Sequence, residues 1–294
     1  MLFINEQQVR ENLPMSEAVR LMREVFTALR TGDAQNQPRR RMFLPTGTVL
    51  HSMAGAWGKY LGTKVYAANP RHGAAYFFFL LFDAETARPL AQFDANHLGQ
   101  IRTGAASGYA TELLSKKDAR TLGIIGSGFQ ARTQLDAMRE VRDLGDVRVW
   151  SRSEEKRYNF AVETSTRAVA TAEEAVRGAD IVVTATWSKD PVLEAAWISP
   201  GTHVNAMGSN QASRRELPAD LIARADLIAV DALDVARIEA GDLMLAEVDW
   251  DDPRIYELAQ VTGRPEGDPI TIFKSCGLGV EDVAVAAYLY EKLA

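Results

Sequence analysis

A glycine-rich segment after a short apolar run is the first part of the sequence whose residue types could do chemistry. Residues 121–131 read T-L-G-I-I-G-S-G-F-Q-A, so Gly126, Gly128 and Ala131 fill the pattern G-x-G-x-x-G/A. The first glycine permits a tight turn, the second lets the backbone approach a pyrophosphate, and the third position keeps a helix close to a sheet. The segment therefore predicts a dinucleotide-binding loop, and the alternative is a plain structural turn.

The residues after the next expected strand, 147–150, bear on which dinucleotide is bound. An NAD site usually has Asp or Glu here, which accepts a hydrogen bond from the ribose 2′-hydroxyl. This chain instead has Ser151, Arg152 and Ser153, followed by Lys156. Arg152 and Lys156 can bind a 2′-phosphate through charge-assisted hydrogen bonds. We therefore expect NADP(H) to be preferred and NAD(H) to be possible; the alternative for Arg152 is a solvated residue at a helix start.

Further candidate cofactor contacts are Thr184, Thr186 and Asp231, because they end expected strands and ligands of doubly wound sheets bind at the carboxyl ends of the strands. With them, the expected contacts are Thr103, Gly126, Ser127, Gly128, Phe129, Gln130, Ser151, Arg152, Ser153, Lys156, Thr184, Thr186 and Asp231. Ser275 belongs to a Lys-Ser-Cys-Gly turn that contains the one cysteine, Cys276. A catalytic thiol is the alternative interpretation of that turn, and we do not favour it.

Three cationic residues in the first third of the chain form a second set. Arg40 lies in Gln-Pro-Arg-Arg-Arg, Lys64 in an expected strand, and Arg102 at the start of a helix rich in small residues. Cations that meet at one site suit a carboxylate substrate, which arginine can bind through two hydrogen bonds. Each of them taken singly is more often a surface charge.

Composition excludes several classes of protein. The 294 residues are 47% hydrophobic and 24% charged, which is typical of a globular protein. A net charge of −6 argues against a nucleic-acid partner, and a single cysteine fits a reducing compartment. The four histidines show no metal-ligand spacing, and no apolar run reaches the ~18 residues of a membrane span. We expect a cytoplasmic protein with no metal, no nucleic-acid partner and no membrane partner, and no signal segment at its N-terminus.

The order of expected elements predicts two domains. Up to about residue 115, a helix over 15–29 and strands over 48–54, 60–67, 75–82 and 89–93 indicate an α+β domain. From residue 119, strands and helices alternate, which predicts a Rossmann-type doubly wound parallel sheet. We place the dinucleotide-binding domain at 118–280. The substrate-binding and dimerisation domain then comprises 1–117 and 281–294.

Taken together, these segments resemble the ornithine cyclodeaminase/mu-crystallin family over nearly the whole chain. The matching motifs are Gln37-Pro-x-Arg40, Gly62-Thr-Lys64, Arg102-Thr-Gly-Ala-Ala-Ser, the glycine loop, and Lys274-Ser275-x-Gly277 with Glu281-Asp282. The resemblance implies a homodimer and a carboxylate clamp of Arg40, Lys64 and Arg102. It also implies that Lys64 is the catalytic proton donor or acceptor, and that the turn with Ser275 contacts the nicotinamide end of the cofactor. The arginine assignment is open by one residue within Arg39–Arg41.

One departure from the family's cyclodeaminases bears on the substrate. In those enzymes an aspartate after the fifth strand holds the distal amine, whereas this chain has Asn210, a candidate substrate contact. An amide carries no charge for an ammonium group and exchanges no proton. The resemblance therefore favours an NAD(P)-dependent reductase of a small α-imino acid (ketimine) over an ornithine cyclodeaminase. An alanine-type amino-acid dehydrogenase and a non-catalytic NADPH-binding or small-ligand-binding protein remain as alternatives.

Overall fold

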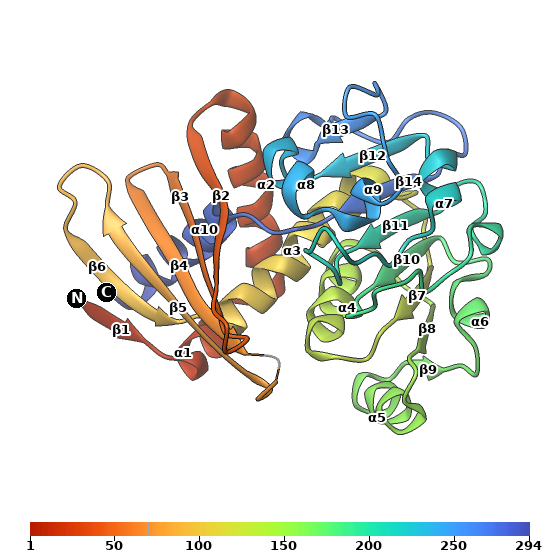
Figure 1. Cartoon of the computed structure of the whole chain (residues 1–294), viewed down its shortest axis with the longest axis horizontal. Coiled ribbons are helices and arrows are strands. Elements are labelled where there is room, and N and C mark those ends of the chain that lie inside the picture. The colour runs from red at the N-terminus through yellow and green to blue at the C-terminus, as the bar shows by residue number, and fades with distance from the viewer. Residues whose placement is uncertain (70) are drawn as a thin grey trace. The chain divides into compact units, whose positions relative to one another are not determined.

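The chain forms two compact units, which are described separately here. The computed structural model describes residues 1–69 and 71–294 (Figure 1). One unit comprises Met1–Arg102 and Gly277–Ala294, and the other comprises Thr103–Cys276. These boundaries fall inside a long helix and just before the last helix, whereas the sequence placed them at 117/118 and 280/281.

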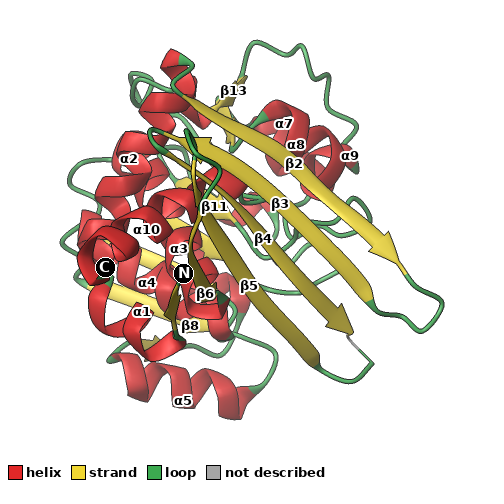
Figure 2. Ribbon diagram, turned by 90° about the vertical axis from the view of Figure 1, so that its left-hand side faces the viewer, coloured by secondary structure: helices red, strands yellow, loops and turns green. Residues whose placement is uncertain are grey.

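A six-stranded sheet with the order β1-β6-β5-β4-β3-β2 forms the centre of the first unit. All neighbours are antiparallel except β1 and β6. The strands are β1 (Leu2–Ile4), β2 (Ala34–Phe43), β3 (Val49–Trp57), β4 (Tyr60–Asn69), β5 (Ala74–Asp83) and β6 (Pro89–Asp94), and Figure 2 shows β2 to β5 side by side. The helices are α1 (Glu6–Asn12), α2 (Met15–Thr31), the first part of α3 (Asn96–Leu114), and α10 (Gly279–Leu293).

The last helix, α10, packs on β3 and β4 and also contacts α2. Glycines permit a close approach at the start of α10. A Cβ on Gly55 would collide with the backbone of Val280, and one on Gly279 would collide with the backbone of Ala54. Because neither glycine has a side chain, the first turn of α10 lies directly against β3.

Strand β2 was not expected from the sequence, which placed its three arginines ahead of a strand. Pro38 and the arginine run argue against a central strand, because proline cannot donate to a ladder. β2 is instead an edge strand, the position at which proline is tolerated. The expected helix over 15–29 is confirmed, and it extends to Thr31 before Gly32 ends it in a left-handed conformation (φ 81°).

The second unit contains an eight-stranded parallel sheet, which confirms the doubly wound prediction. The strand order is β13-β12-β14-β11-β10-β7-β8-β9. The strands are β7 (Thr121–Ile125), β8 (Asp146–Trp150), β9 (Arg167–Ala168), β10 (Ile181–Thr184), β11 (His203–Ala206), β12 (Leu227–Val230), β13 (Ile255–Glu257) and β14 (Thr271–Lys274). The helices between them are α4 (Phe129–Val141), α5 (Glu154–Thr164), α6 (Ala172–Val176), α7 (Ala219–Arg224), α8 (Leu233–Glu239) and α9 (Gly241–Met244), with short 3₁₀ turns at Ala195–Trp197 and Leu258–Gln260.

The order of the strands locates the binding edge of this sheet. The chain runs outward from β7 through β8 to β9, and then returns to add β10 on the other side of β7. In doubly wound folds, ligands bind outside the carboxyl ends of the strands where the order reverses. That point lies between β7 and β10, so the residues after these strands are the ones that matter for binding.

Candidate functional site

The glycine loop joins β7 to α4 and has an open backbone surface. Gly126 has φ 118°, a conformation that favours glycine, and its N–H donates to the carbonyl of Trp150 at 2.8 Å. A Cβ at Gly126 would collide with the carbonyl oxygen of Ala185. Gly128 is the N-cap residue of α4 and has no heavy atom within 4 Å of the position of a Cβ. The loop is therefore shaped for close backbone approach of a diphosphate at a helix N-terminus.

The turn after β8 contains serines and cations and no carboxylate. The hydroxyls of Ser127 and Ser151 are 2.8 Å apart, which joins this turn to the glycine loop. Ser153 caps α5 by accepting from the backbone of Lys156. Arg152 and Lys156 are exposed. A side chain that sequence reasoning missed, Arg157, donates to the carbonyl of Ser151 at 3.1 Å and holds the turn.

The two candidate contacts at the end of β10, Thr184 and Thr186, differ in their exposure to solvent. Thr184 is fully buried, and its hydroxyl donates to Glu216 at 2.9 Å. Thr186 is partly exposed, and both its N–H (2.7 Å) and its hydroxyl (2.6 Å) donate to the same carboxylate. Thr184 is therefore fixed by a protein carboxylate, and Glu216 is a residue that sequence reasoning missed.

The turn after β14 is held by a hydrogen bond to the buried Asp231. The Asp231 carboxylate accepts a hydrogen bond from the N–H of Cys276, and both residues are buried. The N–H of Ser275 donates to the carbonyl of Ala206 at 3.1 Å. The Cys276 thiol is also buried, which does not suit a nucleophile that must reach a substrate.

The remaining candidates of the second unit lie at the start of α4, in α3, and in the loop after β11. Phe129 is 42% exposed and Gln130 is half-buried. Thr103 is buried, and its carbonyl accepts from Gln134 at 3.3 Å. Asn210 is half-buried.

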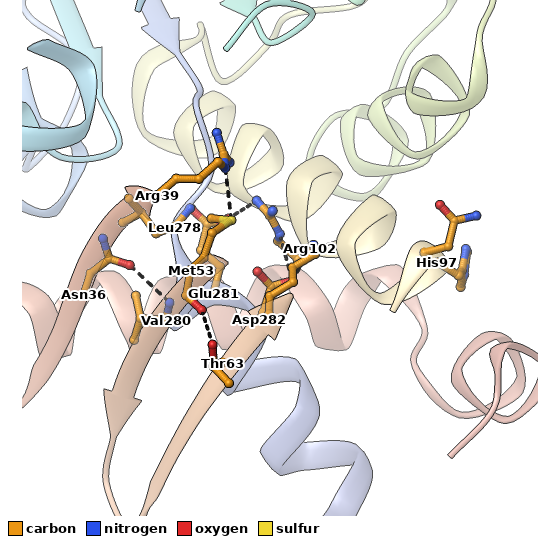
Figure 3. Close-up of polar contacts among 12 residues, drawn as sticks. Asn36, Arg39, Met53, Thr63, His97, Arg102, Leu278, Val280, Glu281 and Asp282 are labelled. Carbon is orange, nitrogen blue, oxygen red and sulfur yellow. Dashed lines mark hydrogen bonds and ion pairs between the residues drawn. The ribbon is translucent and has the colours of Figure 1, made fainter. Parts of the chain in front are cut away.

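A cluster of opposite charges occupies the first unit. The Lys64 ammonium lies 3.0 Å from Asp282 Oδ1, and Arg102 Nε lies 3.3 Å from the same oxygen. Arg102 Nη1 also donates to Glu281 Oε2 at 2.7 Å. Lys64 is 4% exposed and Arg102 5%, whereas both carboxylates are fully buried. These four residues, the charged cluster, join β4, α3 and the first turn of α10. Figure 3 shows Arg102 beside Glu281 and Asp282.

Arg39, and not Arg40, joins this cluster. The pairing of β2 with β3 shifts between Gln37 and Arg40, so that three steps on β2 oppose two on β3. This bulge turns Arg39 toward the side of the sheet that carries Lys64, where it is 7% exposed, and turns Arg40 out to solvent. Arg39 Nε lies 3.3 Å from the sulfur of Met53, the residue that pairs with Lys64, and Figure 3 shows Arg39 and Arg102 approaching Met53.

The surroundings of Lys64 lower its pKa and so favour its neutral form. Burial lowers the pKa of Lys64 to about 8, and the charges of Arg102 and Arg39 act in the same direction. The carboxylate of Asp282 opposes them. A lysine whose pKa is near 8 can release and recover a proton at physiological pH, whereas an exposed lysine cannot.

Next to the charged cluster, three rings stack across β3, β4 and β5. His51 and Tyr66 have ring centroids 4.1 Å apart and Tyr66 and Phe77 4.7 Å apart, with interplanar angles of 6° and 24°. The Lys64 ammonium lies 5.7 Å from the centroid of Phe77. Burial, with the charges of Arg41 and Arg39, lowers the pKa of His51 to about 4, so this ring is neutral at physiological pH.

The described part of the chain has neither a group of metal-ligating side chains nor a membrane-spanning helix. Among the residues that the structure describes, no group of three or more His, Cys, Asp and Glu side chains is arranged to hold a metal ion. Within residues 1–69 and 71–294, no helix combines the length and apolar character that are needed to cross a bilayer.

The fold and these residues define a Rossmann-type protein whose first unit carries a buried lysine, arginines and carboxylates, and whose second unit carries a glycine loop of the dinucleotide-binding type. A model of the ornithine cyclodeaminase/mu-crystallin family matches residues 1–294, so the chain belongs to this family and the predicted resemblance is confirmed.

Individual relatives agree with this assignment. The chain is 40% identical over 227 residues to Delta(1)-pyrroline-2-carboxylate reductase of Bacillus cereus, which covers 72% of this chain and 70% of the relative. The solved structure of the Thermococcus litoralis enzyme of that name, in complex with NADH and L-proline, has a TM-score of 0.94 at 31% identity and covers 99% and 97% of the two chains. An archaeal alanine dehydrogenase dimer with bound NAD has a TM-score of 0.92 at 32% identity, over 99% and 95%.

Gly99 on α3 is expected to keep Lys64 paired with Asp282. A Cβ at Gly99 would collide with the Lys64 ammonium. Gly99→Ala should therefore push the ammonium away from Asp282, which is the carboxylate that raises its pKa, and the pKa of Lys64 should fall below about 8. The substitution itself favours helix by up to ~1 kcal/mol, so the fold should persist. NMR titration of the lysine Cε signals would measure this shift; an unchanged or raised pKa would contradict the assigned contact.

Proposed function

We propose that this protein is an NAD(P)-dependent oxidoreductase that reduces a small α-imino acid to the α-amino acid. The observation that carries the proposal is the charged cluster, in which a lysine with a pKa near 8 stands among arginines and carboxylates. The relatives support it, since one is a reductase of a cyclic imino acid and another was solved with NADH and L-proline. The glycine loop supplies the matching dinucleotide site.

Arg39 and the residues of the charged cluster have different parts in the proposed reaction. Arg39 and Arg102 bind the substrate carboxylate, which fixes the C=N bond in one orientation. The glycine loop and the turn after β8 would hold a reduced dinucleotide, whose nicotinamide would supply a hydride to the imine carbon. Lys64 donates a proton to the imine nitrogen, and Asp282 keeps enough positive charge on Lys64 for it to act as the acid. Arg39 replaces Arg40 in the clamp, because only Arg39 lies on the side of Lys64.

A second candidate reaction is the dehydrogenation of an amino acid such as alanine. The archaeal alanine dehydrogenase dimer favours it, and the same residues would serve with Lys64 as the base. Ornithine cyclisation is less favoured, because Asn210 offers no charge to a second amine. A non-catalytic NADPH-binding protein is the alternative of another class. Binding alone does not require a buried lysine whose pKa is near 8.

The role of Lys64 as an acid predicts a pH dependence. Imine reduction needs the protonated lysine, so kcat/KM for reduction should fall as the pH rises through about 8, while amino-acid oxidation should rise there. Asp282→Asn removes a charge that raises this pKa, so its break should move to lower pH. Initial rates with cyclic imines, or with pyruvate plus ammonia, followed by NADPH absorbance, would measure the reductive pH profiles of the wild type and of Asp282→Asn.

Lys64→Ala provides the matching test of the lysine itself. It should lower kcat at least ~100-fold, as removal of an acid does, and change the Kd of the dinucleotide no more than about threefold. Equal losses of turnover and of dinucleotide binding would show that Lys64 has only a structural part. Tight NADPH binding by the wild type without any turnover would support the binding protein instead.

For the cofactor, we propose that NADP(H) is preferred and that NAD(H) is also accepted. The support is the turn after β8, where Arg152 and Lys156 are exposed and residues 151–153 include no acid that would bind a ribose 2′-hydroxyl. Arg152→Asp should therefore reverse the preference, lowering kcat/KM with NADPH at least ~10-fold more than with NADH. Arg157→Lys is the control, since this residue holds the turn through a carbonyl and should affect the two cofactors alike. A wild type that strongly prefers NADH would overturn the proposal.

We propose that the protein forms a homodimer through the side of the first unit's sheet that faces away from α10. Large apolar side chains are exposed on that side, namely Met42, Leu50, Leu61, Tyr76 and Phe78. A monomer seldom exposes a contiguous apolar patch of this kind, and one relative is a dimer.

Substitution of two of these residues tests the dimer. Tyr76→Glu with Phe78→Glu should convert a dimer to a monomer in light scattering after gel filtration. The symmetric interface would then bury negative charges of the two protomers against each other. Phe129→Glu, an equally exposed aromatic residue of the other unit, is the control. A wild type that elutes as a monomer would contradict the proposal.

A further inference from the structure

A fully buried carboxylate joins the ends of two neighbouring strands in the second unit. Glu216 accepts four hydrogen bonds: from the hydroxyl of Thr184 (2.9 Å), the N–H and hydroxyl of Thr186 (2.7 and 2.6 Å), and the N–H of Gly208 (2.7 Å). Thr184 ends β10, Thr186 follows it, and Gly208 follows β11. Four donors on two oxygens fill the capacity of an ionised carboxylate.

A second carboxylate and a lysine extend these contacts to a third strand. Asp242 Oδ1 accepts from the N–H groups of Glu216 (2.6 Å) and Leu217 (2.9 Å), and its Oδ2 lies 2.9 Å from the ammonium of Lys274 at the end of β14. Lys274 also donates to the carbonyl of Ser209. The side chains of Glu216, Asp242 and Lys274 are fully buried. We call these three residues the buried triad.

Lys274 and the two carboxylates of the buried triad attract each other, whereas the two carboxylates repel each other. Burial works against the charged form of Lys274, but Asp242, Cys276 and Glu216 outweigh it and raise its pKa above the ordinary value. Burial and the charge of Asp242 raise the pKa of Glu216, and Lys274 and Thr186 act against that rise. A carboxylate in a dry interior loses the hydrogen bonds that water would supply. Such a group is kept only where its hydrogen bonds are filled, as they are here for Glu216.

The three strands that the triad joins lie together on one side of the strand reversal. The order β14-β11-β10 continues into β7-β8-β9. A doubly wound fold binds a dinucleotide with two halves, one mononucleotide each. The glycine loop and the turn that reads the ribose 2′ position belong to β7 and β8, the adenosine half. The half built from β10, β11 and β14 therefore receives the nicotinamide nucleotide.

We propose that Glu216, with Asp242 and Lys274, is a positioning residue for the nicotinamide half of the cofactor site. This inference rests on the proposed dinucleotide function. The triad holds the turns after β10, β11 and β14 in the shape that receives the nicotinamide nucleotide, and the adenosine half forms without it.

The turns have little room to compensate for a change in the triad. A Cβ on Gly208 would collide with the backbone of Thr186 and the carboxylate of Glu216. Glu216→Gln keeps the volume but replaces one acceptor oxygen by an NH₂ group, which faces donors. Because a donor cannot accept from the N–H of Thr186 or of Gly208, at least one turn must move.

Calorimetric titration of Glu216→Gln with two ligands tests the proposal. One is the reduced dinucleotide that the wild type binds more tightly, and the other is the matching ADP-ribose, with or without its 2′-phosphate, which lacks the nicotinamide. The Kd of the dinucleotide should rise about tenfold or more, and that of ADP-ribose should stay within about twofold. Thr184→Val, which removes one buried donor to Glu216, should give the same pattern at about threefold.

Asp180→Asn is the matched control, because Asp180 accepts from the N–H groups of Arg120 and Thr121 and from the Thr121 hydroxyl, at the start of β7. It should lower the Tm without changing the ratio of the two Kd values. If the Glu216 variant does not fold, Thr184→Val decides the question. Equal losses for both ligands, or none, would overturn the positioning role. A wild type that binds neither ligand would overturn the proposed function as well.

Discussion

The buried contact between Lys64 and Asp282 is the constraint on which the first unit depends. Lys64 lies on β4, and its partner comes 218 positions later in the chain. Removing a lysine from water costs several kcal/mol unless a counter-charge is supplied, so the C-terminal helix must return to the sheet. The close packing of Gly55 and Gly279 lets it do so. Burial lowers the pKa of Lys64 to about 8 and this contact limits the fall, so one interaction both holds the unit together and keeps positive charge on the proposed proton donor.

Carboxylates have a similar part in the second unit. The glycine loop shapes its own backbone, but the turns after β10 and β11 are shaped by Glu216, and the turn after β14 by Asp231. Polar backbone groups in these turns would be costly if left unpaired in the interior. A buried carboxylate therefore supplies hydrogen-bond partners to the backbone of irregular turns, as ladder hydrogen bonds do for strands. It fixes these turns from the interior of the unit.

In the proposed reaction, the charged cluster acts on the part that small α-imino and α-amino acids share, a carboxylate beside a C=N or C–N bond. Next to Lys64 lie His51 and its stacked neighbours Tyr66 and Phe77. Burial lowers the pKa of His51 to about 4, so this ring adds no positive charge beside the cluster at physiological pH.

The sequence by itself determined the parallel sheet, the dinucleotide loop and the family, because strand and helix periodicity and glycine spacing are local properties of the chain. It also placed Lys64 and Arg102 among the candidates. It could not decide between Arg39 and Arg40, because a bulge in an edge strand reverses the alternation that a pattern assumes. It named Asp282 only as part of a matching motif, and it did not single out Glu216 or Asp242, because a buried acid and a surface acid look alike in the sequence. Only the tertiary structure removes them from water and brings them to their partners, and burial gives these charges their function.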